Sequence, residues 1–171
     1  GIHGAEPPAE MWEAAFGNRA FKAMKSKNTL LPLINKKTED FDLKNAEEIV
    51  SRYKNDSVDA VIGLSNYSTS HTRFRDLLTR VCGSRYASMP LFDASMLEGA
   101  MNVDWKALAS RTLKISKIVN KAEEIEIKTS NGTHISFSKK GRKTESDTGI
   151  LTKTGSFGNL PAGEVYLAPL E

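Results

Sequence analysis

Several features that would identify a specialised class of protein are missing from this sequence of 171 residues. Its single cysteine, Cys82, excludes an intramolecular disulfide and, alone, a thiolate metal cluster. No apolar run approaches the roughly 18 residues that a transmembrane helix needs, and no basic-then-apolar signal segment is present at the start. We therefore expect a cytoplasmic protein that has no membrane partner.

The sequence also lacks a large excess of positive or negative charge. Lys and Arg number 24 and Asp and Glu 21, which gives a net charge of +3. Proteins that bind nucleic acid concentrate positive charge on one face, so we expect no nucleic-acid partner. The motifs CxxC, HExxH, GxSxG and the P-loop do not occur, and no catalytic residue can be assigned from them.

What is present in residues 1–122 is the pattern of an α/β domain with a parallel sheet and flanking helices. Apolar residues recur at helical spacing from Pro8 to about Met24, and Asp42 is a favourable N-cap for a further helix. The pattern continues with a buried strand over 58–64, a polar loop over 65–72, a helix closed by Gly83 and a strand over 85–90. This order is typical of a βαβ unit.

Two strands are too few for a stable sheet. Either further strands precede Gly1, or this half of the protein is unusually helical. The chain begins without Met and stops directly after the strand-like residues 165–167, so we expect it to be a piece of a longer protein. The alternative is a compact domain whose last strand ends at the surface.

The long helix predicted from Asp104 to about Ala122 closes the first domain. Its apolar stripe is expected to contain Trp105, Leu108, Thr112, Ile115, Val119 and Ala122. From residue 123 the hydrophobic period changes from helical spacing to 2, so residues 123–171 are expected to be antiparallel β. A hairpin turns at Asn131-Gly132 there, and a three-residue loop pairs Ile127 with Ile135 and Ile125 with Phe137.

Two segments could form part of a ligand-binding or metal-binding site. Ser70 and His71 stand in a Ser/Thr-rich loop after the carboxyl end of a strand, where open α/β sheets bind ligands. The alternative is that this loop only caps the following helix. The second segment, 152–164, is rich in glycine and ends at Glu164, whose carboxylate could coordinate a divalent metal. A metal needs two or three further protein ligands, and none lies nearby in the sequence, so an exposed glutamate on a turn is the alternative.

The segments that carry a family resemblance are 68–72, 85–90, 141–142, 147–149, 155–165 and 168–171. Through them the sequence from Tyr67 to Glu171 resembles the thermophilic aminopeptidase family of leucyl-aminopeptidase-like metallopeptidases. The segment 155–165 is the most specific, whereas residues before Val58 match only loosely.

This resemblance implies an α/β N-terminal domain followed by a metallopeptidase domain with two divalent ions, such as zinc, cobalt or manganese. It implies a peptide substrate, hydrolysis of the N-terminal residue and a homodimer. Glu164 would be the first metal-binding carboxylate and Glu171 a second candidate. Some relatives have two adjacent glutamates where this sequence has Gly163-Glu164. The resemblance therefore leaves open whether Glu164 or Glu171 is the metal ligand.

The family's remaining metal ligands and its catalytic tyrosine lie downstream of Glu171 and are absent from this sequence. We therefore expect these 171 residues to be inactive alone. Two alternatives remain for the function. The parent protein could be a related single-metal, ring-opening dioxygenase, or the chain could be a non-catalytic dimerisation or binding module that uses the 68–72 loop or the long helix.

Overall fold

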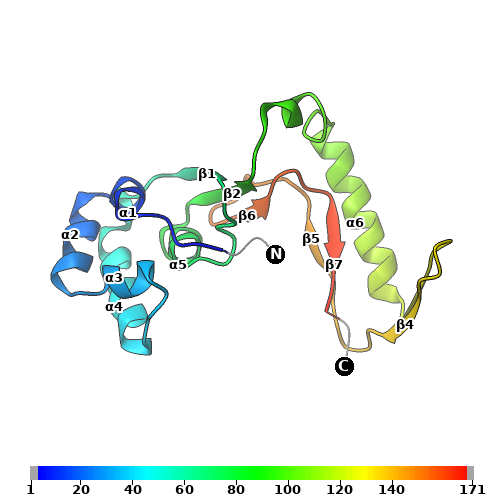
Figure 1. Ribbon diagram of the computed structural model, residues 1–171, viewed down its shortest axis with the longest axis horizontal. Coiled ribbons are helices and arrows are strands. Elements are labelled where there is room, and N and C mark those ends of the chain that lie inside the picture. Colours follow the sequence, from blue (N-terminus) through cyan, green and yellow to red (C-terminus); the bar gives the residue numbers. More distant parts are fainter. Residues whose placement is uncertain (1–3, 169–171) are drawn as a thin grey trace. The chain divides into compact units, whose positions relative to one another are not determined.

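A computed structural model describes residues 4–168 and shows a mixed α/β fold (Figure 1). N-terminal helices precede a three-stranded parallel sheet, and small antiparallel sheets follow. The chain divides into two compact units. Residues up to 101 with residues 151–160 form the first unit, and residues 102–150 with residues from 161 onward form the second. No helix among the described residues is long and apolar enough to cross a membrane.

The N-terminal helices are α1 (Ala9–Phe16), α2 (Asn18–Ser26), α3 (Leu30–Ile34) and α4 (Asp40–Tyr53), followed by the short 3₁₀ turn η1 (Lys54–Asp56). The prediction of one continuous helix to Met24 is wrong, because Gly17 adopts a φ of 81° and separates α1 from α2. A side chain at Gly17 would also place its Cβ 2.7 Å from the Cβ of Asp56. Only glycine fits both conditions.

The N-cap of α4 also differs from the prediction. Glu39 is the N-cap, and Asp42 is the third helical residue. The Asp42 carboxylate accepts a hydrogen bond from the Glu39 backbone N–H at 3.1 Å, which completes a capping box. Asp42 therefore takes part in the cap from inside the helix.

The parallel sheet contains β1 (Ala60–Ser65), β2 (Arg85–Pro90) and β6 (Phe157–Asn159), in that order across the sheet. Between β1 and β2 the chain forms α5 (Arg73–Asp76) and the π-helical turn η2 (Leu77–Cys82). Gly83 ends this helix in the left-handed conformation, as predicted. The third strand, β6, comes from the glycine-rich segment, where no strand was expected before residue 165.

The strand β1 is less buried than its apolar sequence predicts. It lies at the edge of the sheet, and exposed residues alternate along it with half-buried ones. Ile62 is 68% exposed and Leu64 is 57% exposed. The prediction of a buried strand is therefore correct for the strand and wrong for its burial.

An aromatic cluster forms the centre of the first unit. Phe74 of α5 contacts Trp12 and Phe16 of α1, with ring centroids 5.3 and 5.6 Å apart. On its other side Phe74 meets Tyr86 of β2 at 6.3 Å. All four rings are at most 1% exposed, so this cluster joins α1 and α5 to the sheet.

After the 3₁₀ turn η3 (Ala94–Leu97), the second unit begins with α6 (Trp105–Lys121), which Asp104 caps as predicted. The hairpin of β3 (Glu124–Lys128) and β4 (His134–Ser138) has the predicted register, with Ile127 opposite Ile135. A second antiparallel pair contains β5 (Glu145–Asp147) and β7 (Glu164–Tyr166).

The buried face of α6 matches most of the predicted stripe: Thr112 is buried, and Trp105, Leu108, Val119 and Ala122 are half-buried. Ile115 is the exception at 46% exposed, and Ala109 and Ser116 are buried in addition. The helix packs against β5 and β7. The predicted apolar stripe therefore identifies most of the packed face, with Ser116 in place of Ile115.

Candidate functional site

Glu164 opens strand β7, and the residue before it determines how the strand begins. Gly163 has a φ of 111°, and its N–H donates to the Asp147 carbonyl oxygen at 2.9 Å. A Cβ at Gly163 would lie 3.0 Å from Leu108 Cδ1 of α6. Glycine at this position therefore lets β7 leave the loop close to the helix and places Glu164 opposite Asp147 in β5.

One face of the β5–β7 pair carries four polar side chains. Because side chains alternate along a strand, Glu145, Asp147, Glu164 and Tyr166 share this face. Partial burial raises the pKa of Tyr166, and the negative charges of the three carboxylates raise it further. The three carboxylates therefore act electrostatically on Tyr166.

These residues do not complete a metal site. Among the described residues, no group of three or more His, Cys, Asp or Glu side chains could hold a metal ion. Glu164 is exposed and could supply one ligand, with Asp147 across the strand pair as its nearest acidic counterpart in the register. Glu171, the second predicted ligand, lies outside the described residues.

The other two predicted site residues, Ser70 and His71, lie in the loop after β1 and differ in accessibility. Ser70 is 6% exposed, whereas His71 is exposed to solvent. Thr72, the next residue, is the N-cap of α5: its hydroxyl oxygen accepts a hydrogen bond from the Arg75 N–H at 3.1 Å. The loop therefore does cap the helix, and only His71 of the predicted pair faces solvent.

Ser70 belongs to a buried network of hydroxyl groups. Its Oγ donates to Asn159 Oδ1 of β6 at 2.7 Å and lies 3.2 Å from Ser88 Oγ of β2. The Tyr86 hydroxyl donates to Thr69 Oγ1 at 2.9 Å. These bonds join the loop after β1 to β2 and β6, which gives Ser70 a positioning role within the first unit.

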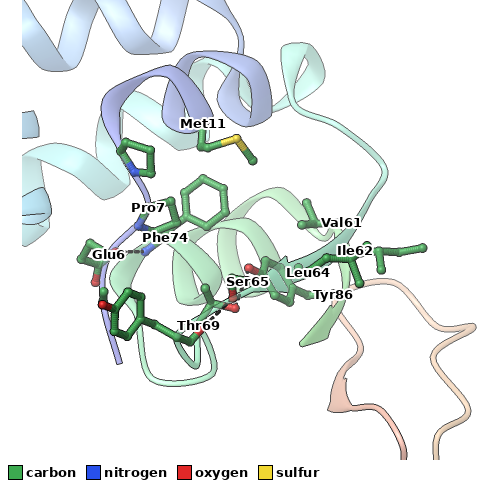
Figure 2. A pocket seen from close by; sticks show the side chains of 14 residues that line it. Glu6, Pro7, Met11, Val61, Ile62, Leu64, Ser65, Thr69, Phe74 and Tyr86 are labelled. Atoms are coloured by element: carbon green, nitrogen blue, oxygen red, sulfur yellow. Dashed lines mark hydrogen bonds between the residues drawn. The ribbon is translucent and has the colours of Figure 1, made fainter. Parts of the chain in front are cut away.

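A pocket of about 390 Å³ lies beside this network (Figure 2). Its lining comes from the segment before α1, from α1, β1 and α5, from Tyr67 and Thr69 in the loop after β1, and from Tyr86 of β2. Most of the lining is apolar, and Figure 2 shows Pro7, Met11 and Val61 around the ring of Phe74. The pocket is thus a hollow at the side of the aromatic cluster.

Glu6 is the charged residue in the pocket wall. Its two carboxylate oxygens accept hydrogen bonds from the backbone N–H groups of Arg73 and Phe74, at 2.5 and 3.1 Å. Burial raises the pKa of Glu6, and these two hydrogen bonds oppose the rise. Glu6 therefore holds the N-terminal segment against the start of α5.

Sequence reasoning did not find this pocket. Glu6 and Tyr86 are 80 positions apart, and no motif connects them. Neither the Asp147–Glu164 pairing nor the clustering of Ser70 with Asn159 was visible, because both depend on strand register between distant segments. Comparison with known proteins adds no identity: no family model, no curated protein and no solved structure matches this chain.

Proposed function

We propose that this chain is the N-terminal part of a metal-dependent aminopeptidase, in which Glu164 is a metal ligand and the substrate is a peptide. The placement of Glu164 carries the proposal. The side chain is exposed at the first residue of a strand, on a face that it shares with two further carboxylates. Carboxylate oxygens are ligands for divalent metals, and an exposed carboxylate can still meet ligands from another segment.

The remaining ligands would come from residues outside the described part of the chain. The two divalent ions expected from the resemblance would supply Lewis-acid catalysis and an activated water when bound. Within the chain, Gly163 and Asp147 position Glu164 through the β5–β7 pairing. In the loop after β1, His71 is accessible to a ligand, whereas Ser70 is buried in the hydroxyl network.

The proposal is tested on the parent protein by comparing Glu164→Gln with a matched control, Glu124→Gln. Glu124 is also an exposed glutamate at the start of a strand in the second unit. We expect Glu164→Gln to lower bound metal and to reduce hydrolysis of an aminoacyl-nitroanilide by about 100-fold or more, since even outer-shell residues contribute about 10–100-fold. Glu124→Gln should retain both properties.

Three results would contradict the proposal. The first is full metal binding and activity in Glu164→Gln. The second is iron-dependent ring opening of a dihydroxypyridine by the parent protein without peptide hydrolysis, which would favour the dioxygenase. The third is peptidase activity, sensitive to a chelator, in the isolated 171-residue chain, because the proposal leaves that chain without a complete metal site.

A further inference from the structure

We propose that the tip of the β3–β4 hairpin is a site of intramolecular modification, at which the backbone nitrogen of Gly132 closes a succinimide ring on the side chain of Asn131. The ring then opens with water to aspartate or isoaspartate. All groups that take part belong to residues 129–133. The proposal therefore does not depend on the proposed metal site, and either can fail without the other.

The reaction is an attack by one residue on its neighbour, with water as the only co-reactant. The Gly132 nitrogen forms a bond to Cγ of Asn131, the Cγ–Nδ2 bond breaks, and the proton of the Gly132 N–H leaves with the side-chain NH₂ as ammonia. Water then adds to one of the two carbonyl carbons of the ring, and the bond from that carbon to nitrogen breaks. The new carboxylate lies on the side chain in aspartate and on the main chain in isoaspartate.

Gly132 supplies an unhindered nucleophile. Ring closure brings this nitrogen onto the preceding side chain, and a side chain on the attacking residue would obstruct it. The surroundings are also open, because a Cβ at Gly132 would meet no atom of the described residues within 4 Å. The Gly132 N–H donates to the Thr129 carbonyl oxygen at 3.2 Å, at the long end of the range for such bonds, and this bond must open before the attack.

Thr129 activates the group that is attacked. Its hydroxyl donates a hydrogen bond to Asn131 Oδ1 and accepts one from the Thr133 N–H at 3.2 Å. When the nitrogen adds to Cγ, negative charge develops on Oδ1. A donor directed at that oxygen stabilises the charge, as in the oxyanion holes of enzymes. The bond from Thr133 holds the hydroxyl in place and polarises it further.

The leaving group and the water are both accessible. Within residues 4–168, the Asn131 Nδ2 donates no hydrogen bond, so nothing retains the NH₂ that departs. Asn131 and Gly132 are exposed, and water therefore reaches the ring once it has formed. Nucleophile, polarised carbonyl and free leaving group are thus present in one turn.

The modification would act on the hairpin at the point that sets its register. The three-residue loop of residues 130–132 aligns Ile127 with Ile135. Isoaspartate adds one methylene group to the main chain inside this loop, and the pairing of a hairpin depends on the length of its loop. We therefore expect isoaspartate at residue 131 to weaken the β3–β4 pairing.

The test follows the 171-residue chain during incubation at mildly alkaline pH by peptide mapping and mass spectrometry, with released ammonia measured in parallel. We expect Asn131 to convert to aspartate and isoaspartate with the release of one ammonia per converted residue. Asn102 is the internal control, because it is also exposed but precedes Val103, whose branched side chain obstructs the attacking nitrogen. Asn102 should remain unchanged over the same period.

Variants of the loop test the role of Thr129. Thr129→Val removes the hydroxyl at nearly constant shape and should slow the conversion of Asn131 by about twofold to tenfold, the rate equivalent of one hydrogen bond. Thr129→Ser retains the hydroxyl and should convert like the wild type. Thr133→Val is the matched control, since it removes a hydroxyl of the same loop that makes no bond to Asn131. It should also convert like the wild type.

Unfolding separates the folded turn from the local sequence. In concentrated urea the Thr129 hydroxyl no longer has a fixed position, so the wild type and Thr129→Val should convert at the same rate. An intact Asn131 after prolonged incubation, or an equal or faster conversion in folded Thr129→Val, would overturn the proposal. So would a slower conversion of Thr129→Val that persists unchanged in urea.

Discussion

At the scale of single residues, Glu6 shows how one half-buried carboxylate links two segments that are far apart in the sequence. It accepts backbone hydrogen bonds at the start of α5 and lines the pocket next to β1. The two bonds favour its charged form, whereas burial disfavours it, and burial prevails because the pKa is raised.

The first prediction follows from the sign of this pKa shift. An acid with a higher pKa in the folded than in the unfolded protein binds its proton more tightly when folded. The stabilisation from the protonated form is therefore lost as pH rises from the ordinary value of 4.5 through the raised native value. We expect the free energy of unfolding of the wild type, relative to Glu6→Gln, to fall in this window and then level off.

The measurement is urea unfolding of both proteins at closely spaced pH values from below pH 4.5 to neutrality. Parallel stability curves, or a relative gain of the wild type with rising pH, would show that burial does not control the ionisation of Glu6.

The second prediction compares two leucines of the same short helix. Leu33 of α3 is fully buried, whereas Leu31 is 67% exposed. Leu33→Ala removes packed methyl groups and leaves a cavity, so we expect a loss of about 2–5 kcal/mol in the free energy of unfolding. Leu31→Ala should change it by no more than about 0.5 kcal/mol. Equal losses in denaturant titrations of the two variants would contradict the packing of α3.

At the scale of elements, the ends of helices and the register of the hairpin follow local rules. Asp104 caps α6 by accepting hydrogen bonds from Lys106 N–H at 2.9 Å and Ala107 N–H at 3.0 Å. The hairpin register was predictable, because only one alignment places Ile125, Ile127, Ile135 and Phe137 on the same face. Both features depend on residues that are close in the sequence.

The third prediction tests the cap of α6. Asp104→Ala leaves two backbone N–H groups without their side-chain acceptor, and we expect a loss of about 1 kcal/mol, within roughly 0.5–2 kcal/mol. Hydrogen exchange at Lys106 and Ala107 should accelerate. Asp93→Ala is the control, since Asp93 caps the separate turn η3 and its loss should leave exchange in α6 unchanged. Faster exchange in α6 in the control would mean that the effect is not local.

Elements whose position depends on distant residues were harder to predict. The strand β6 has only three residues and lies in a glycine-rich segment, so neither length nor composition identified it. It forms because Tyr86 N–H bonds to the Ser156 carbonyl at 2.8 Å and Leu160 N–H bonds to that of Ser88 at 3.0 Å. The break between α1 and α2 likewise depends on the close approach of Asp56 to Gly17.

At the scale of the whole molecule, the glycine-rich segment serves both units. Residues 151–160 belong to the first and residues from 161 onward to the second. In the first unit the segment supplies Asn159 to the hydroxyl network, and in the second it supplies Glu164 to the carboxylate face. The glycine-rich sequence of this segment indicated that Glu164 could be a functional residue. Only the fold shows that Asn159 bonds to Ser70 and that Glu164 pairs with Asp147.

The sequence by itself determined the fold class, the βαβ order, the cap of α6 and the hairpin register, because each follows from periodicity or from residues within a few positions. Tertiary structure alone decided that β1 is an exposed edge, that Ser70 is buried, and that Asp147 pairs with Glu164. Burial and strand pairing depend on which distant segments meet, and a local pattern does not contain that information. An apolar strand at the edge of a sheet therefore has the same sequence pattern as one at its centre.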